Sequence, residues 1–338
     1  MSDQKIINVP VVFADRFYMS QKALNEIARL GGYTVAGAID SGDLAEKIRG
    51  SSAVRVIVSE YVPLNDAVLK QAPALKGVIA YGAGYDHIDV EAMRRKGVMV
   101  CNCRGQNAQA VAELTFGLLL CLMRRINQTD PWIRAGEWAE AGRALPEWVS
   151  GRELWRKTLG VIGLGQIGAR VVRIAKGFDM RVIGYDPFMN PDHYGRLGVE
   201  PVALEELISL SDVVTLHLPL TPDTERMIDS RMLAGAKSGM ILVNTARGKV
   251  VDEEALIDAL QAGRIGGAAL DVFAVEPLPS GHPLTAMDNV ILSPHLGGLS
   301  REAGDRLSDA VARQVKAILE GQQPECLILS EGGSQRRR

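Results

Sequence analysis

The stretch Thr158-Leu159-Gly160-Val161-Ile162-Gly163-Leu164-Gly165-Gln166-Ile167-Gly168 decides the fold of this chain. Its first five residues form a short apolar run typical of a buried parallel strand, and the remaining six follow the pattern G-x-G-x-x-G. A helical stretch, Ala169 to Gly177, comes next, and a second strand, Arg181 to Tyr185, leads directly into Asp186. This order of elements, a strand, a glycine turn, a helix, a second strand and an acid, predicts an α/β unit that binds a dinucleotide.

The three glycines and the acid have separate physical roles in such a unit. Gly163 permits the tight turn, Gly165 lets a pyrophosphate approach the backbone, and Gly168 lets the helix lie close to the strand. The helix N-terminus offers N–H groups and positive dipole to the phosphates. Asp186 can accept hydrogen bonds from the adenosine ribose, and a proline and a phenylalanine follow it, so no adjacent cation would attract a 2′-phosphate. We therefore predict NAD as the cofactor, against the alternative of an ordinary glycine turn.

The size and charge of the chain restrict its architecture and partners. With 338 residues the chain is long enough for two domains. Lys and Arg number 38 and Asp and Glu 40, which gives a net charge of −2 and no electrostatic basis for binding nucleic acid or an anionic membrane. The longest apolar run, Leu114 to Met123, is too short for a bilayer, and the N-terminus lacks a signal-peptide pattern. We predict a cytoplasmic protein.

The cysteines indicate neither a metal site nor a disulfide framework. Their spacing fits no zinc motif, and two of the four follow a strand-like run. We therefore expect reduced thiols in the core and no bound metal. The four residues are Cys101, Cys103, Cys121 and Cys326.

The first part of the chain alternates short apolar strands with helical stretches, which predicts a parallel sheet covered by helices. The expected elements are Val9–Ala14, Gln21–Leu30, Val54–Ser59, Asp66–Gln71, Gly77–Tyr81, Val90–Lys96 and Val98–Cys101. Between Tyr81 and Asp89 the loop contains Ala83 and Gly84. Such a loop can present backbone N–H groups to an anion or serve only as a tight turn, and the residues alone leave both open.

The same alternation continues after the glycine turn. A long apolar helix, Asn107 to Arg125, is expected to lead the chain into the dinucleotide unit, and a final helix, Arg301 to Leu319, to return it to the first domain. Gly332 to Arg338 is expected to be a disordered tail. The elements between are helix Leu204–Ser209, strand Asp212–His217, strand Met240–Thr245, helix Glu253–Ala262, strand Ile265–Asp271 and strand Val290–Ser293.

Three polar residues follow successive strands of this second sheet, where doubly wound sheets bind their ligands. Arg247 carries a forked cation suited to a carboxylate. Glu276 and His295 supply an acid and an imidazole after the next two strands. Hydride transfer between a 2-hydroxy acid and NAD needs a cation for the carboxylate, a base for the hydroxyl proton and a group that orients the base.

His295 is the best candidate for the base among five histidines. His217 also follows a strand, but its position favours contact with the cofactor. The others, His87, His193 and His282, are expected in loops. Any one of these histidines, or Arg247 or Glu276, could be structural in isolation, so the inference depends on their joint occurrence.

With these motifs in place, the chain resembles the D-isomer specific 2-hydroxyacid dehydrogenases over nearly its full length. The matching segments are Gly163–Gly168 with Asp186, Val111–Leu114, His217–Pro219, Asn244–Gly248, Leu270–Phe273 with Glu276-Pro277, and Pro294–Gly298. The resemblance implies two Rossmann-like, doubly wound parallel-sheet domains. One, of residues 1–104 and 299–338, would be a discontinuous substrate-binding domain, and the other, of residues 105–298, would bind NAD.

The resemblance also implies a role for each site residue. Arg247 would bind the substrate carboxylate and carbonyl oxygen, His295 would be the acid/base, and Glu276 would hold its imidazole. The amides of Ala83 and Gly84 would bind the substrate carboxylate, and Asp271 would contact the nicotinamide amide. The remaining residues expected at the cofactor are Gln166, Ile167, His217, Pro219, Thr245, Ala246 and Gly297, with Arg247 and His295 in contact with it as well.

The leading function is therefore an NAD-dependent oxidoreductase that interconverts a D-2-hydroxy acid and its 2-oxo acid. A corepressor-like regulatory protein that binds NAD is an alternative, because such proteins keep the same three site residues. A phosphite-type or formate-type dehydrogenase is another, although Glu276 beside His295 disfavours the formate type, which resembles a Gln–His arrangement. The sequence does not identify which 2-hydroxy acid is the substrate.

The tryptophans suggest how the protein assembles. All four lie between Pro131 and Trp155, in a segment too long for a simple connection and without a strand pattern. Aromatic residues are enriched at protein interfaces, so we interpret the segment as an arm that packs on a second copy of the chain in a homodimer. The alternative is that the tryptophans cover the core of their own domain. They are Trp132, Trp138, Trp148 and Trp155.

Overall fold

The computed structural model describes residues 7–329, which form two compact α/β units. Unit 1 consists of the described parts of Met1–Asn107 and Gly298–Arg338, and unit 2 is Ala108–Gly297. The boundaries expected from the sequence were 104/105 and 298/299. The predicted tail, Gly332–Arg338, lies outside the described residues. Within residues 7–329, no helix is both long and apolar enough to cross a bilayer.

Unit 1 contains a sheet with strand order β13-β5-β4-β3-β1-β2, which is parallel except for β13. Alternate residues of the central strands face opposite sides. Val12 and Ile57 join one core cluster, while Val11 and Val56 join another. The strands are β1 Val11–Phe13, β2 Tyr33–Val35, β3 Val56–Ser59, β4 Gly77–Ala80, β5 Met99–Asn102 and β13 Leu327–Leu329.

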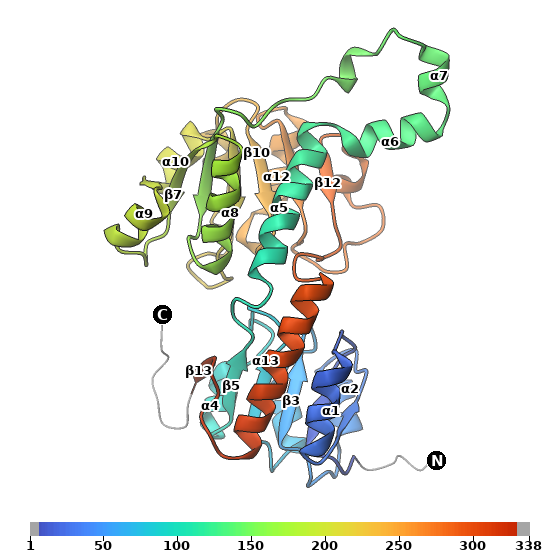
Figure 1. The fold of residues 1–338 in the computed structure, drawn as a ribbon, viewed down its shortest axis with the longest axis vertical. Coiled ribbons are helices and arrows are strands. Elements are labelled where there is room, and N and C mark those ends of the chain that lie inside the picture. The colour runs from blue at the N-terminus through green and yellow to red at the C-terminus, as the bar shows by residue number, and fades with distance from the viewer. Residues whose placement is uncertain (1–6, 330–338) are drawn as a thin grey trace. The chain divides into compact units, whose positions relative to one another are not determined.

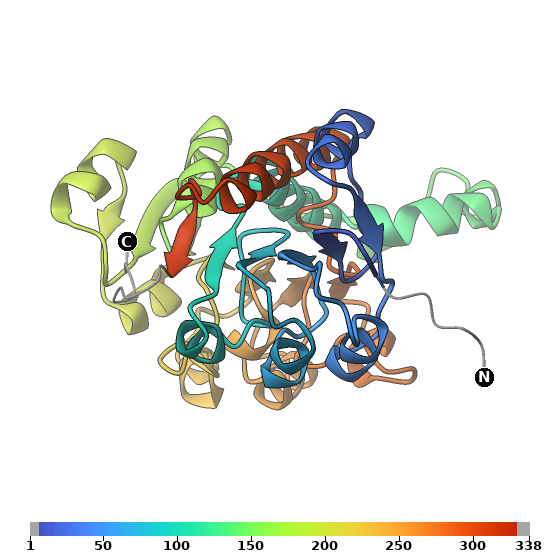
Figure 2. The ribbon, with the colours of Figure 1, turned by 90° about the horizontal axis from the view of Figure 1, so that it is seen from below.

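Helices cover both faces of this sheet, which makes it doubly wound. Figure 2 shows α1 and α13 on one face and α2, α3 and α4 on the other. Each of these five helices starts at a side-chain cap, such as Ser20 for α1 and Asp89 for α4. The helices are α1 Gln21–Arg29, α2 Ser41–Lys47, α3 Asp66–Gln71, α4 Val90–Arg95 and α13 Arg301–Leu319.

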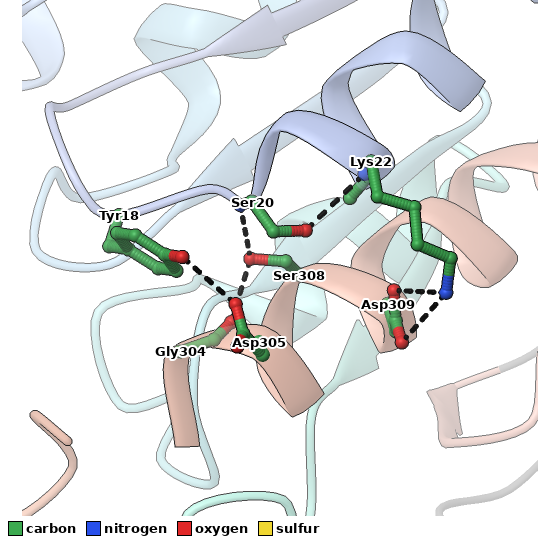
Figure 3. Close-up of polar contacts among 8 residues, drawn as sticks. Tyr18, Ser20, Lys22, Gly304, Asp305, Ser308 and Asp309 are labelled. Carbon is green, nitrogen blue, oxygen red and sulfur yellow. Dashed lines mark hydrogen bonds and ion pairs between the residues drawn. The ribbon is translucent and has the colours of Figure 1, made fainter. Parts of the chain in front are cut away.

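Helix α13 returns the end of the chain to unit 1, as the sequence predicted. Polar contacts with the segment before and inside α1 fix its position (Figure 3). The Ser308 hydroxyl accepts a hydrogen bond from the Ser20 amide at 2.9 Å and donates to the Gly304 carbonyl at 2.7 Å. Tyr18 donates to Asp305, and Lys22 pairs with Asp309. The apolar residues of the two helices pack in the same core cluster.

Unit 2 contains a fully parallel sheet with strand order β12-β11-β10-β9-β6-β7-β8. The order runs outward in both directions from the neighbours β6 and β9, so a topological switch point lies at the carboxyl end of β6, where the glycine turn begins. The strands are β6 Thr158–Ile162, β7 Arg181–Tyr185, β8 Glu200–Pro201, β9 Val213–Leu216, β10 Ile241–Asn244, β11 Gly267–Leu270 and β12 Val290–Leu292.

Helices again cover both faces of the sheet. Residues of α5 and α8 share one core cluster, and residues of α10, α11 and α12 share the other. Helix α5 is apolar around most of its circumference, as expected for a buried helix. The elements are α5 Ala108–Met123, α6 Ile126–Arg134, α7 Glu137–Ala141, α8 Gln166–Gly177, α9 Pro191–Leu197, α10 Leu204–Leu210, α11 Ser230–Ala234, α12 Glu253–Gln261 and the short 3-10 helices η1 Glu147–Val149, η2 Gly248–Val250 and η3 Pro283–Ala286.

Several elements differ from the sequence prediction. Helix α8 begins at Gln166, directly after Gly165, rather than at Ala169. Strand β2 was missed because it has only three residues, and helices α2 and α9 because each is short and polar. Strand β13 was missed because it pairs with a distant segment, β5. His193 was expected in a loop but lies on α9.

The tryptophan segment is helical and forms an extension of unit 2. Helix α6 packs against the end of α5, and α6 and α7 extend away from the sheet of unit 2 (Figure 1). No residue of α6, α7 or η1 is buried. Trp138, Trp148 and Trp155 have exposed fractions of 49%, 37% and 52%, so these side chains do not cover the core of their own unit. Trp132 is half-buried and makes an edge contact with Trp148.

Candidate active site

The glycine turn after β6 has the geometry that the fingerprint requires. Gly163 has φ +89°, a conformation that side chains disfavour, and a Cβ there would lie 2.5 Å from the His217 carbonyl oxygen. A Cβ on Gly168 would lie 2.0 Å from the Gly163 carbonyl oxygen, so only glycine lets α8 start this close to the strand. Around Gly165, by contrast, the position of a Cβ has no heavy atom within 4 Å. The turn is therefore tight on two sides and open at Gly165, which suits a pyrophosphate at the N-terminus of α8.

Asp186 lies beside this turn at the end of β7. Its Oδ2 accepts a hydrogen bond from the Leu164 amide at 2.9 Å, and its Oδ1 accepts one from the Phe188 amide at 3.0 Å. The carboxylate is thus held at the turn by backbone groups. A carboxylate oxygen can accept more than one hydrogen bond, so acceptor capacity remains for a ribose hydroxyl.

The residues expected to line the cofactor follow β9 and β10. His217 is buried, its Nε2 lies 2.9 Å from the Thr215 hydroxyl, and its Nδ1 is a buried atom without a hydrogen-bond partner. Burial lowers the pKa of His217 to about 3, so its imidazole is neutral and unsuited to acid/base work near neutral pH. The Thr245 hydroxyl lies 2.9 Å from that of Thr115 on α5. Pro219 and Ala246 border the same strand ends, whereas Gln166 and Ile167 open α8.

Strands β10, β11 and β12 are parallel neighbours, so the segments after them share one edge of the sheet. Arg247 follows β10, and its Nη1 donates to the Ala246 carbonyl at 2.8 Å. The buried Asn244 holds this turn, because its side chain donates to the Arg247 carbonyl and accepts from the Ala246 amide. A Cβ on Gly248 would lie 1.9 Å from the Phe273 backbone, so a glycine is required where the turn meets the segment after β11.

Glu276 and His295 form a hydrogen-bonded pair at this edge. His295 Nδ1 lies 2.7 Å from Glu276 Oε2, and Glu276 Oε1 accepts from the Phe273 amide at 2.9 Å. Burial by itself lowers the pKa of His295, but the hydrogen bond and charge of Glu276 outweigh it, and the net shift is upward. Burial favours the neutral form of Glu276, yet the bond from His295 leaves the pKa of Glu276 below its ordinary value. The positive charge of Arg247 contributes to both shifts: it opposes the rise in the pKa of His295 and adds to the fall in the pKa of Glu276.

Asp271 fixes the turn that carries His295. It is only 1% exposed, and its Oδ1 accepts from the Ser293 hydroxyl at 2.5 Å and the Leu296 amide at 2.7 Å. Its Oδ2 accepts from the Gly297 amide at 2.7 Å. His295 itself has φ +56°, which is uncommon for a residue with a side chain and needs support from its surroundings. The contact between Asp271 and the nicotinamide stays a prediction, but its bonds to the His295 turn are present.

Ala83 and Gly84 belong to unit 1, whereas Arg247, Glu276 and His295 belong to unit 2. The Ala83 carbonyl accepts a hydrogen bond from the Asn102 side chain at 2.7 Å, and the Gly82 carbonyl accepts one from the Cys103 amide at 2.7 Å. The loop is therefore attached to the end of β5, and both residues are half-buried.

A second loop of unit 1 is fixed by a residue that the sequence analysis did not single out. The nearly buried Asp15 accepts hydrogen bonds from the amides of Glu60, Tyr61 and Val62, directly after β3. An acid two residues beyond a strand is a weak signal by itself. In the same way, nothing in the sequence indicated that Asn244 and Ser293 support the turns of Arg247 and His295.

Residues 116–297 match the family model described as D-isomer specific 2-hydroxyacid dehydrogenase, NAD binding domain. Glyoxylate reductase of Korarchaeum cryptofilum is 40% identical over 288 residues, which are 85% of this chain and 86% of that protein. Two solved structures are similar over 96% and 98% of this chain and 100% of their own. They are a D-lactate dehydrogenase from Aquifex aeolicus complexed with NAD and lactic acid (29% identity, TM-score 0.81) and an NADPH-dependent glyoxylate/hydroxypyruvate reductase from Sinorhizobium meliloti in complex with NADP and malonate (27% identity, TM-score 0.85).

These matches agree with the two parallel-sheet units and with the glycine turn of unit 2. The family model lies entirely within unit 2, because it starts inside α5 and ends at the boundary residue Gly297. The identity to the reductase extends over most of the chain, so unit 1 is included in the similarity. The chain is an oxidoreductase that belongs to the D-isomer specific 2-hydroxyacid dehydrogenase family.

Proposed function

We propose that the protein is an NAD-dependent dehydrogenase that interconverts a small D-2-hydroxy acid and its 2-oxo acid. The observation that carries this proposal is the 2.7 Å pair of Glu276 and His295 beside the charge of Arg247, on neighbouring strand ends. This set offers a cation, an acid/base and a group that orients it. The substrate class follows from these groups and from the relative that is called glyoxylate reductase.

In the direction of reduction, Arg247 binds the carboxylate of the 2-oxo acid and polarises its carbonyl oxygen. His295 donates a proton to that oxygen as the hydroxyl forms. Its Nδ1–H is engaged by Glu276, so the proton comes from Nε2. Glu276 stabilises the charged imidazolium and fixes the plane of the ring. NADH, when bound, supplies the hydride. In the oxidative direction neutral His295 accepts the hydroxyl proton.

Unit 1 is proposed to be the substrate-binding domain. The amides of Ala83 and Gly84 follow the carboxyl end of β4, the side of a parallel sheet at which ligands bind. They are proposed to bind the substrate carboxylate, which is the role expected of a substrate-binding domain. A cytoplasmic location also stays a prediction.

The choice of NAD over NADP rests on Asp186. Its carboxylate is held at the glycine turn, where a 2′-phosphate would meet a negative charge. Solved structures similar to this chain include one complexed with NAD and one complexed with NADP, so fold alone does not decide the cofactor.

A panel of 2-oxo acids tests the proposal. Each acid is assayed with NADH and with NADPH, and turnover is measured as the loss of absorbance of the reduced cofactor. Glyoxylate, hydroxypyruvate, pyruvate and bulkier acids should be compared at equal concentration. We expect turnover of at least one small acid, with NADH preferred. NAD binding without turnover of any acid would instead favour the corepressor-like alternative.

The pH dependence tests the role of Glu276. Because Glu276 raises the pKa of His295, replacing it by glutamine should lower that pKa. Reduction needs protonated His295 and declines as pH rises through this pKa, so the alkaline limit of reduction should move to lower pH in Glu276→Gln. Oxidation needs neutral His295, so its acidic limit should move to lower pH as well. Profiles of kcat/KM in both directions provide the measurement, and unchanged limits would contradict the role.

The segment predicted as an arm, Pro131 to Trp155, is proposed to pack on a second copy of the chain. Residues 126–149 form an extension that includes most of this segment. It exposes large apolar side chains, including Ile133 and Leu145 besides the tryptophans, and contributes no buried residue to unit 2. Several exposed large apolar side chains in one segment are typical of an interface between subunits. In a two-fold dimer each extension would meet the same surface on its partner.

Light scattering coupled to size exclusion should give a dimeric mass at micromolar concentration. The double change Trp138→Ala and Trp148→Ala should shift this mass towards the monomer, because it removes large aromatic contacts. Ile39→Ala is the matched control, since Ile39 is an exposed apolar residue of unit 1, 85% exposed and outside the extension. A monomeric native protein would refute the arrangement.

A further inference from the structure

Helix α9 bonds to both sides of the cofactor turn. It starts at Pro191, shortly after Asp186, and the Asn190 side chain caps it. The helix is short, because it ends at Leu197. Even so, two consecutive residues of α9, His193 and Tyr194, reach the segments that follow β6 and β7.

Tyr194 holds the backbone of the ribose-binding acid. Its hydroxyl accepts a hydrogen bond from the Asp186 amide at 2.7 Å and donates to the Asp186 carbonyl at 3.0 Å. These two backbone groups lie just beyond the end of β7, where sheet pairing has stopped. Tyr194 is 8% exposed, and burial raises the pKa of its hydroxyl, which therefore keeps the proton that it donates.

His193 holds the other side of the turn. Its Nε2 lies 3.0 Å from the Leu164 carbonyl oxygen, and because a carbonyl only accepts, Nε2 carries the proton. The Leu164 amide in turn donates to the Asp186 carboxylate. Leu164 and Asp186 are thus bonded to each other and each is bonded to α9.

The consequence concerns a cofactor with a 2′-phosphate. To accommodate that phosphate, the Asp186 carboxylate would have to move away, which requires the Leu164 and Phe188 amides to lose their acceptor. If the backbone at Asp186 and Leu164 were free, the turn could shift with the side chain. Hydrogen bonds from α9 oppose that shift.

We propose that His193 and Tyr194 are positioning residues that set the preference for NADH over NADPH by holding Asp186 and the glycine turn in place. This inference rests on the proposed preference for NAD. Neither residue needs to touch the cofactor, and both act through Asp186.

The test compares kcat/KM for NADH and NADPH, and the binding of each cofactor by calorimetry, in four variants. Tyr194→Phe keeps the ring in the core but loses both hydrogen bonds, and His193→Leu loses the donor to Leu164. His193→Gln is the conservative variant, because its amide can replace Nε2–H. Leu197→Ala is the structural control, since Leu197 packs on the same core from α9.

We expect the NADH/NADPH ratio to fall by about tenfold in Tyr194→Phe, a factor within the range expected when its two hydrogen bonds to the Asp186 backbone are lost. His193→Leu should lower the NADH/NADPH ratio, whereas His193→Gln should keep it near the native value. Leu197→Ala should lower the melting temperature but leave the NADH/NADPH ratio unchanged. In an Asp186→Ser background Tyr194→Phe should cause no further change, because α9 acts through Asp186.

Two results would overturn the inference while leaving the proposed function intact: an unchanged ratio in Tyr194→Phe, or an equal loss of affinity for both cofactors. A native protein that uses NADPH as well as NADH would overturn both the inference and the proposed role of Asp186.

Discussion

Replacing His295 by alanine is expected to lower kcat in both directions by about 10²–10⁴-fold, the usual contribution of a positioned general acid/base. The alanine variant keeps Arg247 and the cofactor turn, so NADH binding and the KM for the 2-oxo acid should change little. Steady-state kinetics, with calorimetry for NADH, separate these effects. Turnover close to that of the native protein would exclude His295 as the acid/base.

Unit 2 offers a matched control for this variant. His282 Nε2 lies 3.3 Å from Glu253 Oε1, and both side chains are largely buried, so this is a second histidine–glutamate pair. It differs in position, because His282 precedes the 3-10 helix η3 instead of following a strand. His282→Ala should therefore reduce stability but leave kcat near the native value. A comparable loss of kcat in both variants would indicate a general effect on folding.

Replacing Arg247 by alanine should lower kcat/KM for the 2-oxo acid by about 10²–10⁴-fold. Two charge-assisted hydrogen bonds to a carboxylate contribute about 1.5–3 kcal/mol each, and each 1.36 kcal/mol is a factor of ten. The KM should rise, because the carboxylate is bound in the ground state as well. Arg247→Lys should recover only part of the loss, since an ammonium group cannot form the bidentate contact.

The control for Arg247 is Lys249→Ala. Lys249 is an exposed cation two residues further along the same turn, and its loss changes the net charge equally. We expect nearly native kinetics from this variant. A second measurement uses the neutral amide of the substrate. The native protein should strongly prefer the acid, whereas Arg247→Ala should prefer it much less; an undiminished preference would argue against carboxylate binding by Arg247.

The sequence predicted the two α/β folds and the location of the candidate chemistry. Glycine spacing is set by local sterics, so Gly163 and Gly168 could be interpreted without a tertiary structure, and the close contacts at both positions agree. Short apolar runs also predicted most strands, because buried parallel strands need apolar residues on both faces. Since parallel strands end at a common edge, Arg247, Glu276 and His295 could be assigned to one edge.

Elements whose stability comes from distant partners were missed. Strand β13 exists because it pairs with β5, and α9 is a short polar helix whose residues bond to the cofactor turn. Their local sequences carry little periodicity, so neither could be distinguished from a loop. The same limit applies to Asp15, whose carboxylate holds a loop far along the chain.

What the sequence by itself determined is therefore the set of candidate polar groups and the sheet edge that carries them. Only the tertiary structure decided how those groups are held: Asp271 around the His295 turn, Asn244 around Arg247, and Tyr194 behind Asp186. The physical reason is that these supports are hydrogen bonds between segments distant in sequence. Their donors and acceptors are ordinary polar residues, and the local sequence does not indicate which of them form hydrogen bonds with each other.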